Sequence, residues 1–502
     1  MSEIYDLLVV GGGVNGCGVA RDAAGRGLRV LLCESGDLAG QTSSRSTKLI
    51  HGGLRYLEHY EFRLVREALR EREVLLSMAP HVVWPMRFVL PYNQNLRPVW
   101  MIRAGMFLYD YLAGRKVLKA SRCINLSQHV AGSALKDNSS KGFIYSDCAT
   151  YDSRLVVLNA IDAAEHGASI LTRTKCLVAR RQEHHWVAAL QDTISGRRFD
   201  VTARALVNAT GPWVNAFIDD ALKIPTAYRI RLIKGSHMVV PRLFEHDHAY
   251  ILQHSDQRIV FAIPFEQDYS LVGTTEVDYD GDPAQVSMSE GEVAYLCGVI
   301  NSYFKTQTRP QDAVSTYAGV RPLFDDAESS ASAVSREYIL ALDNGDGRAP
   351  LISVFGGKLT AYRQVAEHTL AKLLPAMKTK TSTWTSEPGH PLPGGDLTDF
   401  VEFDRTLVQQ YAWLPKATVH RLARLYGTRA YNVLGKASSQ EELGRHFGAN
   451  LYEAEVRYLL DKEWARTAED ILWRRTRLGL HLSKQQLTQL QQWLDDYWRM
   501  AA

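Results

Sequence analysis

The sequence predicts an α/β fold with a second, antiparallel sheet and a separate helical region at the C-terminal end. Three patterns support this prediction. Residues 6–34 read as a strand, a glycine-rich turn, a helix and a second strand, which is the order of a parallel α/β unit. Between residues 236 and 275, short runs alternate apolar and polar residues as antiparallel strands do. Beyond residue 400 the apolar residues recur with the 3.6-residue period of helices.

The first strand–turn–helix unit indicates a dinucleotide site. Residues 6–10 form an apolar run that suits a buried parallel strand. Gly11, Gly13 and Gly16 then satisfy the pattern G-x-G-x-x-G; these glycines allow a tight turn, close approach to a pyrophosphate, and helix packing on the strand. The second strand ends at Glu34, whose carboxylate suits an adenosine ribose. This unit alone does not separate FAD from NAD.

Two later turns favour a flavin. The segment 205–214 is an apolar strand that runs into Ala209 and Gly211, small residues that let a cofactor pass close to the backbone. The segment 351–370 is another strand, a Gly-Gly turn and a helix, with Lys358 near the start of the helix. A helix N-terminus stabilises the negative charge that a reduced flavin ring gains.

The loop TSSRSTKLIHGGLRYLEHYEF, at residues 42–62, combines hydroxyl groups, basic groups and a glycine pair. The hydroxyl and lysine side chains suit hydrogen bonds to a pyrophosphate and to a flavin edge. We therefore predict that this loop lies against a flavin and faces a phosphorylated substrate.

At these residues the chain closely resembles the FAD-dependent glycerol-3-phosphate dehydrogenases of the respiratory, quinone-linked type. The shared motifs keep the family's order along nearly the whole chain and include GGGVNGCGVARDAAGRGL, SSRSTKLIHGGLRYLEHYEFRLVREAL, NATGPWV, IRLIKGSHMVVP, VGTTE, YAGVRPL, VFGGKLTAYR and ILWRRT. The resemblance implies a glutathione-reductase-type FAD-binding domain interleaved with an antiparallel-sheet substrate domain, plus an all-α C-terminal domain. It also implies oxidation of sn-glycerol 3-phosphate to dihydroxyacetone phosphate, with electrons passing through non-covalently held FAD to ubiquinone or menaquinone.

We expect the FAD-binding domain to be discontinuous, because its glycine turns are far apart in the chain. The expected ranges are 1–80, 145–215 and 345–375 for the FAD-binding domain, 81–144 and 216–344 for the substrate-binding domain, 376–400 for a linker, and 401–502 for a helical cap. For the helical cap we expect a capping role and oligomer contacts, with a homodimer as one form.

Oxidation of a secondary alcohol phosphate requires an anchor for the phosphate. Arginine suits this role because its planar fork donates two hydrogen bonds at once. Among the residues that match the family's motifs, we expect basic and hydroxyl side chains to bind the substrate: Arg55, Tyr56, Thr274 or Thr275, Arg321, Arg336 and Lys358. We place Arg321 among the catalytic residues as well.

The reaction also requires a base that removes the hydroxyl proton, and two histidines compete for this role. His237, in KGSHMVV, lies on an expected substrate-domain strand, and His51, in IHGG, lies in the expected flavin loop. A histidine near its usual pKa accepts a proton at neutral pH. We favour His237 as the base and keep His51 as the alternative, either as base or as flavin neighbour.

The residues that we expect at the cofactor lie on the glycine turns and on the loop at 42–62. They are Gly11, Gly13, Asn15, Gly16, Glu34, Thr42, Ser43, Ser44, Ser46, Lys48, His51, Gly53, Ala209, Gly211, Gly357, Lys358, Leu359 and Thr360.

Composition narrows the function classes. A net charge of +3 argues against a nucleic-acid partner. The six cysteines show no C-x-x-C pair and no zinc spacing, so we expect reduced thiols and no metal. The acidic segment 278–289 departs from a calcium loop at its glycine and at its last position.

Location bears on the electron acceptor. We expect no cleaved secretory leader, because the first residues have no basic region followed by a long apolar run. No run of about 18 apolar residues occurs in the sequence, so we expect no membrane-spanning helix. Residues 84–119 mix aromatic and basic side chains, which suits a membrane surface; the helix expected at 62–79 is basic and amphipathic. With the resemblance, these patterns predict a peripheral, monotopic protein on the cytoplasmic face of the bacterial inner membrane.

Three rival functions remain at this stage. A glycerol-3-phosphate oxidase performs the same half-reaction with O2 as acceptor. An FAD amine oxidase of the D-amino-acid oxidase type shares the cofactor unit but has no use for a cluster of Arg55, Arg321 and Lys358. A nucleotide-sensing module would bind the dinucleotide without oxidising a substrate.

Overall fold

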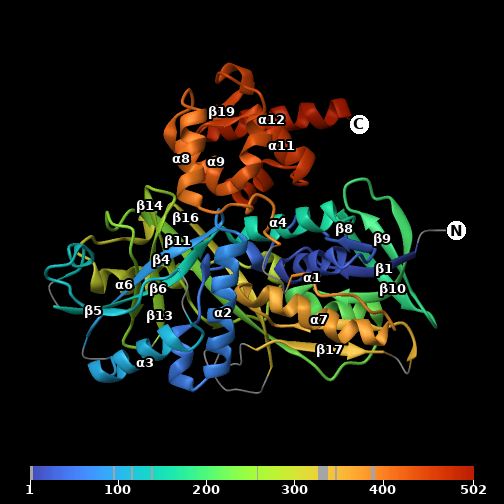
Figure 1. The fold of residues 1–502 in the computed structure, drawn as a ribbon, viewed down its shortest axis with the longest axis horizontal. Coiled ribbons are helices and arrows are strands. Elements are labelled where there is room, and N and C mark those ends of the chain that lie inside the picture. Colours follow the sequence, from blue (N-terminus) through green and yellow to red (C-terminus); the bar gives the residue numbers. More distant parts are fainter. Residues whose placement is uncertain are drawn as a thin grey trace.

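The structure, a computed structural model, describes residues 4–93, 96–114, 117–136, 140–256, 258–325, 337–344, 347–385 and 390–501. Within these ranges the chain forms two large sheets and a helical C-terminal domain, which lies above the sheets in Figure 1 (orange to red). The predicted α/β class with a helical C-terminal region is confirmed.

The first sheet is the mostly parallel one, in the order β17-β18-β10-β1-β2-β7, with β9 beside β10 and β8 beside β9. Its strands are β1 (Ile4–Val10), β2 (Val30–Cys33), β7 (Ser169–Leu171), β8 (Thr174–Arg181), β9 (Trp186–Asp192), β10 (Arg198–Asn208), β17 (Ile339–Asp343) and β18 (Leu351–Phe355). The central strands are continuous apolar runs because helices cover the sheet, which leaves them little contact with water.

Three helices pack beside this sheet: α1 (Val14–Gly25), α4 (Asp152–Glu165) and α7 (Tyr362–Ala376). Small residues on α1 allow close packing. At Gly18, for example, an added Cβ would lie 2.8 Å from the ring of Tyr362 on α7.

The second sheet has the order β15-β11-β14-β13-β12-β4-β6-β3, with β16 beside β11 and β5 beside β6. Its strands are β3 (Leu49–Ile50), β4 (Val83–Pro91), β5 (Arg122–Asn125), β6 (Lys141–Thr150), β11 (Ile230–Pro241), β12 (Ala249–Gln253), β13 (Ile259–Phe265), β14 (Tyr269–Gly273), β15 (Val277–Asp278) and β16 (Ser315–Phe324). Its pairs are antiparallel except for β4 with β12. The helices α2 (Phe62–Met78), α3 (Val99–Tyr111) and α6 (Glu290–Tyr303) belong to this part of the chain.

The domain ranges stay predictions, but sheet membership bears on two of their boundaries. Strand β6 lies in the second sheet along its whole length, so the expected boundary at 144/145 falls inside a strand. Strand β17, within the range expected for the substrate domain, pairs with β18 in the first sheet. Alternation of residue types does not reveal which sheet a strand joins, because that choice depends on its neighbours in space.

The C-terminal domain has its own apolar core. It contains α8 (Phe400–Gln410), α9 (Lys416–Tyr426), α10 (Ala430–Leu434), α11 (Glu453–Lys462) and α12 (Lys484–Ala501), together with a π-helical turn (Asp470–Arg475) and a small hairpin of β19 (His446–Gly448) and β20 (Leu451–Tyr452). In the part of the chain that the structure describes, no helix is long and apolar enough to cross a bilayer.

Candidate active site

A cavity of about 1040 Å³ is lined by residues from both sheets. The first sheet contributes the turns that follow β1, β2, β10 and β18, all at the carboxyl ends of parallel strands. Ligands of α/β sheets bind at this edge because helix N-termini and flexible turns meet there. The second sheet contributes side chains of β11, β13 and β16.

Two glycines at the turn after β1, Gly11 and Gly16, have no room for a side chain. Gly11 has a φ of +116°, and a Cβ there would lie 2.4 Å from the carbonyl oxygen of Ala209. At Gly16 a Cβ would lie 1.9 Å from the carbonyl oxygen of Gly11. The turn therefore brings bare backbone to the cavity wall, immediately before α1 begins at Val14.

Polar groups at this turn fit a dinucleotide. Ser43 holds the N-terminus of α1, because its Oγ accepts a hydrogen bond from the Val14 amide at 3.0 Å. Asn15 lines the cavity, and its buried Oδ1 has no hydrogen-bond partner among the described residues. Glu34 accepts from the Gly12 and Gly36 amides at 2.7 and 2.8 Å. These bonds fix the carboxylate at the end of β2, where such folds bind a ribose; the role of Glu34 stays a prediction.

A group of basic side chains lines another part of the cavity. Arg321 Nη2 donates to Thr274 Oγ1 at 3.0 Å, and its Nη1 lies 3.3 Å from Glu276 Oε1. Lys358 Nζ lies 3.9 Å from the centroid of the Tyr56 ring. An aromatic face stabilises a cation, and the paired arginine has a defined orientation. The cavity therefore presents oriented cations beside the dinucleotide turns.

His237 lies beside these cations, on β11. Its Nε2 is 2.9 Å from Thr47 Oγ1, and its ring stacks on Tyr317 with a centroid distance of 4.9 Å. Gly273, opposite it on β14, leaves room for the imidazole. Burial holds the pKa of His237 well below its usual value, and the positive charges of Arg321 and Lys48 act in the same direction. The imidazole is therefore neutral at physiological pH.

The cavity brings together most of the residues that the sequence predicted for the site. They are Gly11, Gly13, Asn15, Glu34, Thr42, Ser43, Ser46, His51, Gly53, Arg55, Tyr56, Ala209, Gly211, His237, Thr274, Arg321, Gly357, Lys358, Leu359 and Thr360. Their individual roles stay predictions. Arg336 lies outside the described residues.

Three of the residues expected at the cofactor do not line the cavity: Gly16, Ser44 and Lys48. Gly16 lies behind Gly11, where it lets α1 pack closely. Lys48 pairs with other parts of the protein, and its cofactor-binding role stays a prediction. Its Nζ donates to the Ser44 carbonyl at 2.8 Å and to Asp152 Oδ2 at 2.9 Å, because a buried ammonium needs a counter-charge. Burial lowers the pKa of Lys48 to about 8, while Asp152 opposes that shift.

Among the described residues, nine further charged residues line the cavity and were not predicted: Asp37, Arg45, Lys175, Asp220, Arg258, Glu276, Asp282, Glu469 and Arg474. Arg45 and Glu276 stand close to residues that were predicted for the site, Ser44 and Thr274, so proximity in sequence was a usable signal. Glu469 and Arg474 come from the C-terminal domain, and only tertiary packing brings them here.

Comparisons with known proteins agree with this geometry. The family model described as FAD dependent oxidoreductase matches residues 6–363, and the one described as C-terminal domain of alpha-glycerophosphate oxidase matches residues 388–495. A glycerol-3-phosphate dehydrogenase of Pseudomonas aeruginosa is 54% identical over 98% of this chain and 96% of its own. The aerobic glycerol-3-phosphate dehydrogenase of Escherichia coli K12 is 50% identical, covering 99% and 98%. A D-erythritol 1-phosphate dehydrogenase of Brucella abortus is 49% identical, covering 98% of each chain.

Among solved structures, the glycerol-3-phosphate dehydrogenase from Bacillus halodurans complexed with FAD superposes with a TM-score of 0.77 at 27% identity. The match covers 98% of this chain and 94% of that one.

Proposed function

The chain belongs to the family of FAD-dependent oxidoreductases that carry the C-terminal domain of alpha-glycerophosphate oxidase, and we propose that it oxidises sn-glycerol 3-phosphate to dihydroxyacetone phosphate. It is a flavoenzyme with FAD as its cofactor. One observation carries the proposal for the substrate: the dinucleotide turns, the cations Arg321 and Lys358, and the neutral His237 line one cavity.

The cavity wall supports the cofactor-binding roles that we propose. The turn of Gly11 and Gly13 leads into the N-terminus of α1, where amide groups suit the pyrophosphate. Glu34 suits the adenosine ribose, and the Gly357 turn with Lys358 suits the flavin end. When bound, FAD supplies the acceptor for the hydride that leaves the substrate carbon.

The substrate phosphate pairs with the basic side chains Arg55, Arg321 and Lys358, and Thr274 keeps the Arg321 fork in place. Tyr56 contributes its hydroxyl and holds Lys358 against its ring. An anchored phosphate confines the glycerol carbons to the neighbouring part of the cavity, which raises the effective concentration of the reacting groups.

His237 accepts the proton of the substrate hydroxyl as the hydride leaves. Burial and the charges of Arg321 and Lys48 hold its pKa well below the usual value, so the imidazole is unprotonated across the neutral range. The same shift makes it a weaker base than the histidine near its usual pKa that the sequence predicted. Thr47 orients the imidazole through Nε2. His51 also lines the cavity, with its ring centroid 6.4 Å from that of Phe261, and remains the competing base.

We also propose an electron acceptor and a cellular location for the enzyme. Helix α3 exposes large apolar side chains: Trp100 is 68% exposed and Phe107 and Tyr111 are each 61% exposed. Arg103 is exposed on the same helix. Such a helix suits the interface of a membrane with anionic lipids. By contrast α2 buries Val65, Leu69 and Leu75 and pairs its Arg72 with Asp147, so it packs as an ordinary core helix.

We therefore place the protein on the cytoplasmic face of the bacterial inner membrane, where ubiquinone or menaquinone accepts the electrons. A homodimer stays a prediction from the sequence. The oxidase alternative, with O2 as the acceptor, differs in its product, because it yields peroxide.

Anaerobic addition of substrate to the yellow holoenzyme tests the proposal. sn-Glycerol 3-phosphate should bleach the flavin absorbance promptly, while glycerol and D-amino acids should not. D-Erythritol 1-phosphate, the substrate named for one relative, should reduce the flavin with a lower kcat/KM. Faster reduction by the tetritol phosphate would overturn the substrate assignment. Quinone reduction without peroxide under air would distinguish the dehydrogenase from the oxidase.

A further inference from the structure

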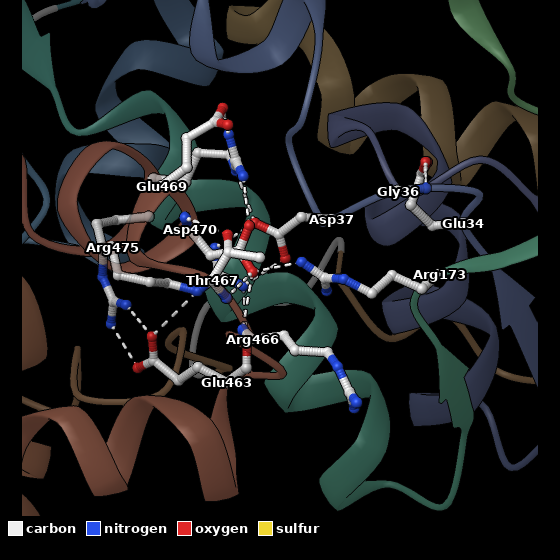
Figure 2. A network of polar contacts seen from close by, with 12 residues as sticks. Glu34, Gly36, Asp37, Arg173, Glu463, Arg466, Thr467, Glu469, Asp470 and Arg475 are labelled. Carbon is white, nitrogen blue, oxygen red and sulfur yellow. Dashed lines mark hydrogen bonds and ion pairs between the residues drawn. The ribbon is translucent and has the colours of Figure 1, made fainter. Parts of the chain in front are cut away.

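A set of buried ion pairs connects the C-terminal domain to the loop that follows β2 (Figure 2). Asp37 lies in this loop, three residues after Glu34. Its carboxylate accepts two hydrogen bonds from Arg475, both at 2.9 Å, and one from Arg474 Nε at 2.7 Å. The side chains of Asp37 and Arg475 are 2% and 0% exposed.

Further ion pairs cross the same interface, and in these the C-terminal domain contributes the acid instead of the arginine. Arg173, beside β8, pairs with Asp470, which also accepts from Arg474 and from the amides of residues 466 and 467. Arg154 on α4 pairs with Glu463, which also lies 3.6 Å from Arg475. Because each side contributes both acids and arginines, the two surfaces have complementary charges.

A third arginine of the same segment, Arg477, is linked through Asp152 to the other end of the loop, near Ser46 and Lys48. Arg477 Nη2 donates to Asp152 Oδ1 at 3.2 Å. Asp152 in turn accepts from Ser46 Oγ at 2.7 Å and from Lys48 Nζ at 2.9 Å. Residues 474–477 therefore hold both ends of loop 37–48, one end directly and the other through Asp152.

Loop 37–48 forms much of the cavity wall at the dinucleotide turn. Its lining residues include Thr42, Ser43 and Thr47, and Ser43 holds the amide at the start of α1. Arg474 lines the cavity itself. The loop also contacts the second sheet through Thr42, whose Oγ1 donates to the Val320 carbonyl at 2.7 Å. Any displacement of its ends would open the wall of the cofactor site.

We propose that residues 474–477 form an arginine clamp that closes loop 37–48 over the cofactor, so that the C-terminal domain controls the retention of FAD. Removal of one partner leaves a buried charge unpaired, which destabilises the closed arrangement far more than loss of an exposed pair does. Coupling between two sites is reciprocal. FAD must therefore stabilise the docked clamp as much as the clamp retains FAD. This inference concerns the cofactor and holds whichever substrate the enzyme takes.

Two variants of the holoenzyme test the clamp: Arg474→Gln and Asp37→Asn. Arg405→Gln is the matched control, because it removes an arginine of the same domain that is 65% exposed and pairs with Glu402 on its own helix. The measurement is the rate at which FAD fluorescence appears after dilution. We expect at least tenfold faster release from the two clamp variants and a change below twofold in the control. Wild-type release rates in both clamp variants would overturn the proposal.

A second readout separates the clamp from a purely structural role. In the clamp variants, flavin fluorescence should rise during heating well before the far-UV circular dichroism changes. If the two signals shift together by the same amount, the interface stabilises the fold and does not act on the cofactor specifically, and the proposal fails.

Wild-type protein provides a measurement that does not depend on how the variants fold. Removal of FAD should raise amide hydrogen exchange in both loop 37–48 and segment 463–478, whereas α12 should change little. Unchanged exchange in segment 463–478 between the holo and apo forms would contradict the reciprocal coupling and the clamp with it.

Discussion

Thr47 Oγ1 lies 2.9 Å from His237 Nε2, across two elements that are 190 residues apart in the sequence. The hydroxyl belongs to loop 37–48, and the imidazole belongs to β11 of the second sheet. Since a hydroxyl both donates and accepts, it orients the ring in either neutral tautomer. This contact connects the cofactor wall to the proposed base.

The first prediction concerns that base. His237→Gln should slow flavin reduction by sn-glycerol 3-phosphate by about 10²–10⁴-fold, which is the usual contribution of a positioned general base. Anaerobic stopped-flow absorbance measures the rate. His184→Gln is the control, because that side chain is 86% exposed. If His237→Gln reduces its flavin at the wild-type rate and His51→Gln reduces it slowly, His51 is the base.

The phosphate anchor yields a second prediction. Arg321→Lys keeps the charge but loses the fork that holds Thr274 and the phosphate together. Loss of one charged hydrogen bond costs about 1.5–3 kcal/mol, so the Kd of the substrate should rise about 10–150-fold. The substrate dependence of the flavin-reduction rate gives this Kd. Arg309→Lys, at an exposed site paired with Asp312, should leave it unchanged.

A third prediction tests the dinucleotide turn. Gly11→Ala places a Cβ 2.4 Å from the Ala209 carbonyl oxygen at a positive φ, so the backbone must move away from the cofactor position. The purified variant should contain less than about a tenth of the wild-type flavin, since the turn is where backbone meets pyrophosphate. Gly291→Ala, in a helix with open space around it, should retain full flavin content.

The fourth prediction links stability to pH through His81. Its side chain is fully buried, and burial, reinforced by Arg154 and Arg424, lowers its pKa to about 3. Below the unfolded pKa of about 6.5, the unfolded chain binds a proton there and the native protein does not. Between the unfolded pKa and the native pKa of His81, each unit by which the pH falls therefore lowers the free energy of unfolding by about 1.4 kcal/mol.

The measurement is the thermal midpoint of the holoenzyme at several pH values. The midpoint should fall as the pH is lowered from 6.5 to 5, and it should fall less steeply in His81→Gln. A variant with the same acid slope as the wild type would show that other groups cause the loss.

The fifth prediction concerns the surface of α3. Glutamate substitutions at Trp100 and Phe107 should weaken binding to anionic vesicles at least tenfold each, because a buried aromatic side chain contributes about 1.5–3 kcal/mol. Co-sedimentation with vesicles measures the binding. Val401→Glu on α8 is the control, since that valine is 75% exposed in the C-terminal domain. If all three variants bind alike, the membrane contact lies elsewhere.

Much of the site was predictable because it consists of local backbone geometry. A few neighbouring residues were enough to predict each of three features: the turn at Gly11 and Gly13, the carboxylate of Glu34, and the Gly357 turn. A glycine that must adopt a positive φ or accept a close neighbour leaves a direct trace in the residue type. The mixed class of the fold follows similarly from strand and helix periodicity.

Side-chain direction and long-range pairing were not predictable in this way. Lys48 belongs to the same loop as Ser46, yet it turns from the cavity toward Asp152, since the position of that buried carboxylate depends on α4. Arg474 enters the cavity wall from a domain more than 400 residues after Asp37 in the chain.

By itself, the sequence determined the glycine-rich turns, the basic motifs that we propose to bind a phosphate, and the division into an α/β part and a helical part, because each depends on residues close together in the chain. Only the tertiary structure decided which strand joins which sheet, which basic side chain faces the cavity, and that the C-terminal arginines reach the cofactor loop. The physical reason is that burial requires a charged or polar group to find a partner, and packing alone decides which distant partner lies within reach.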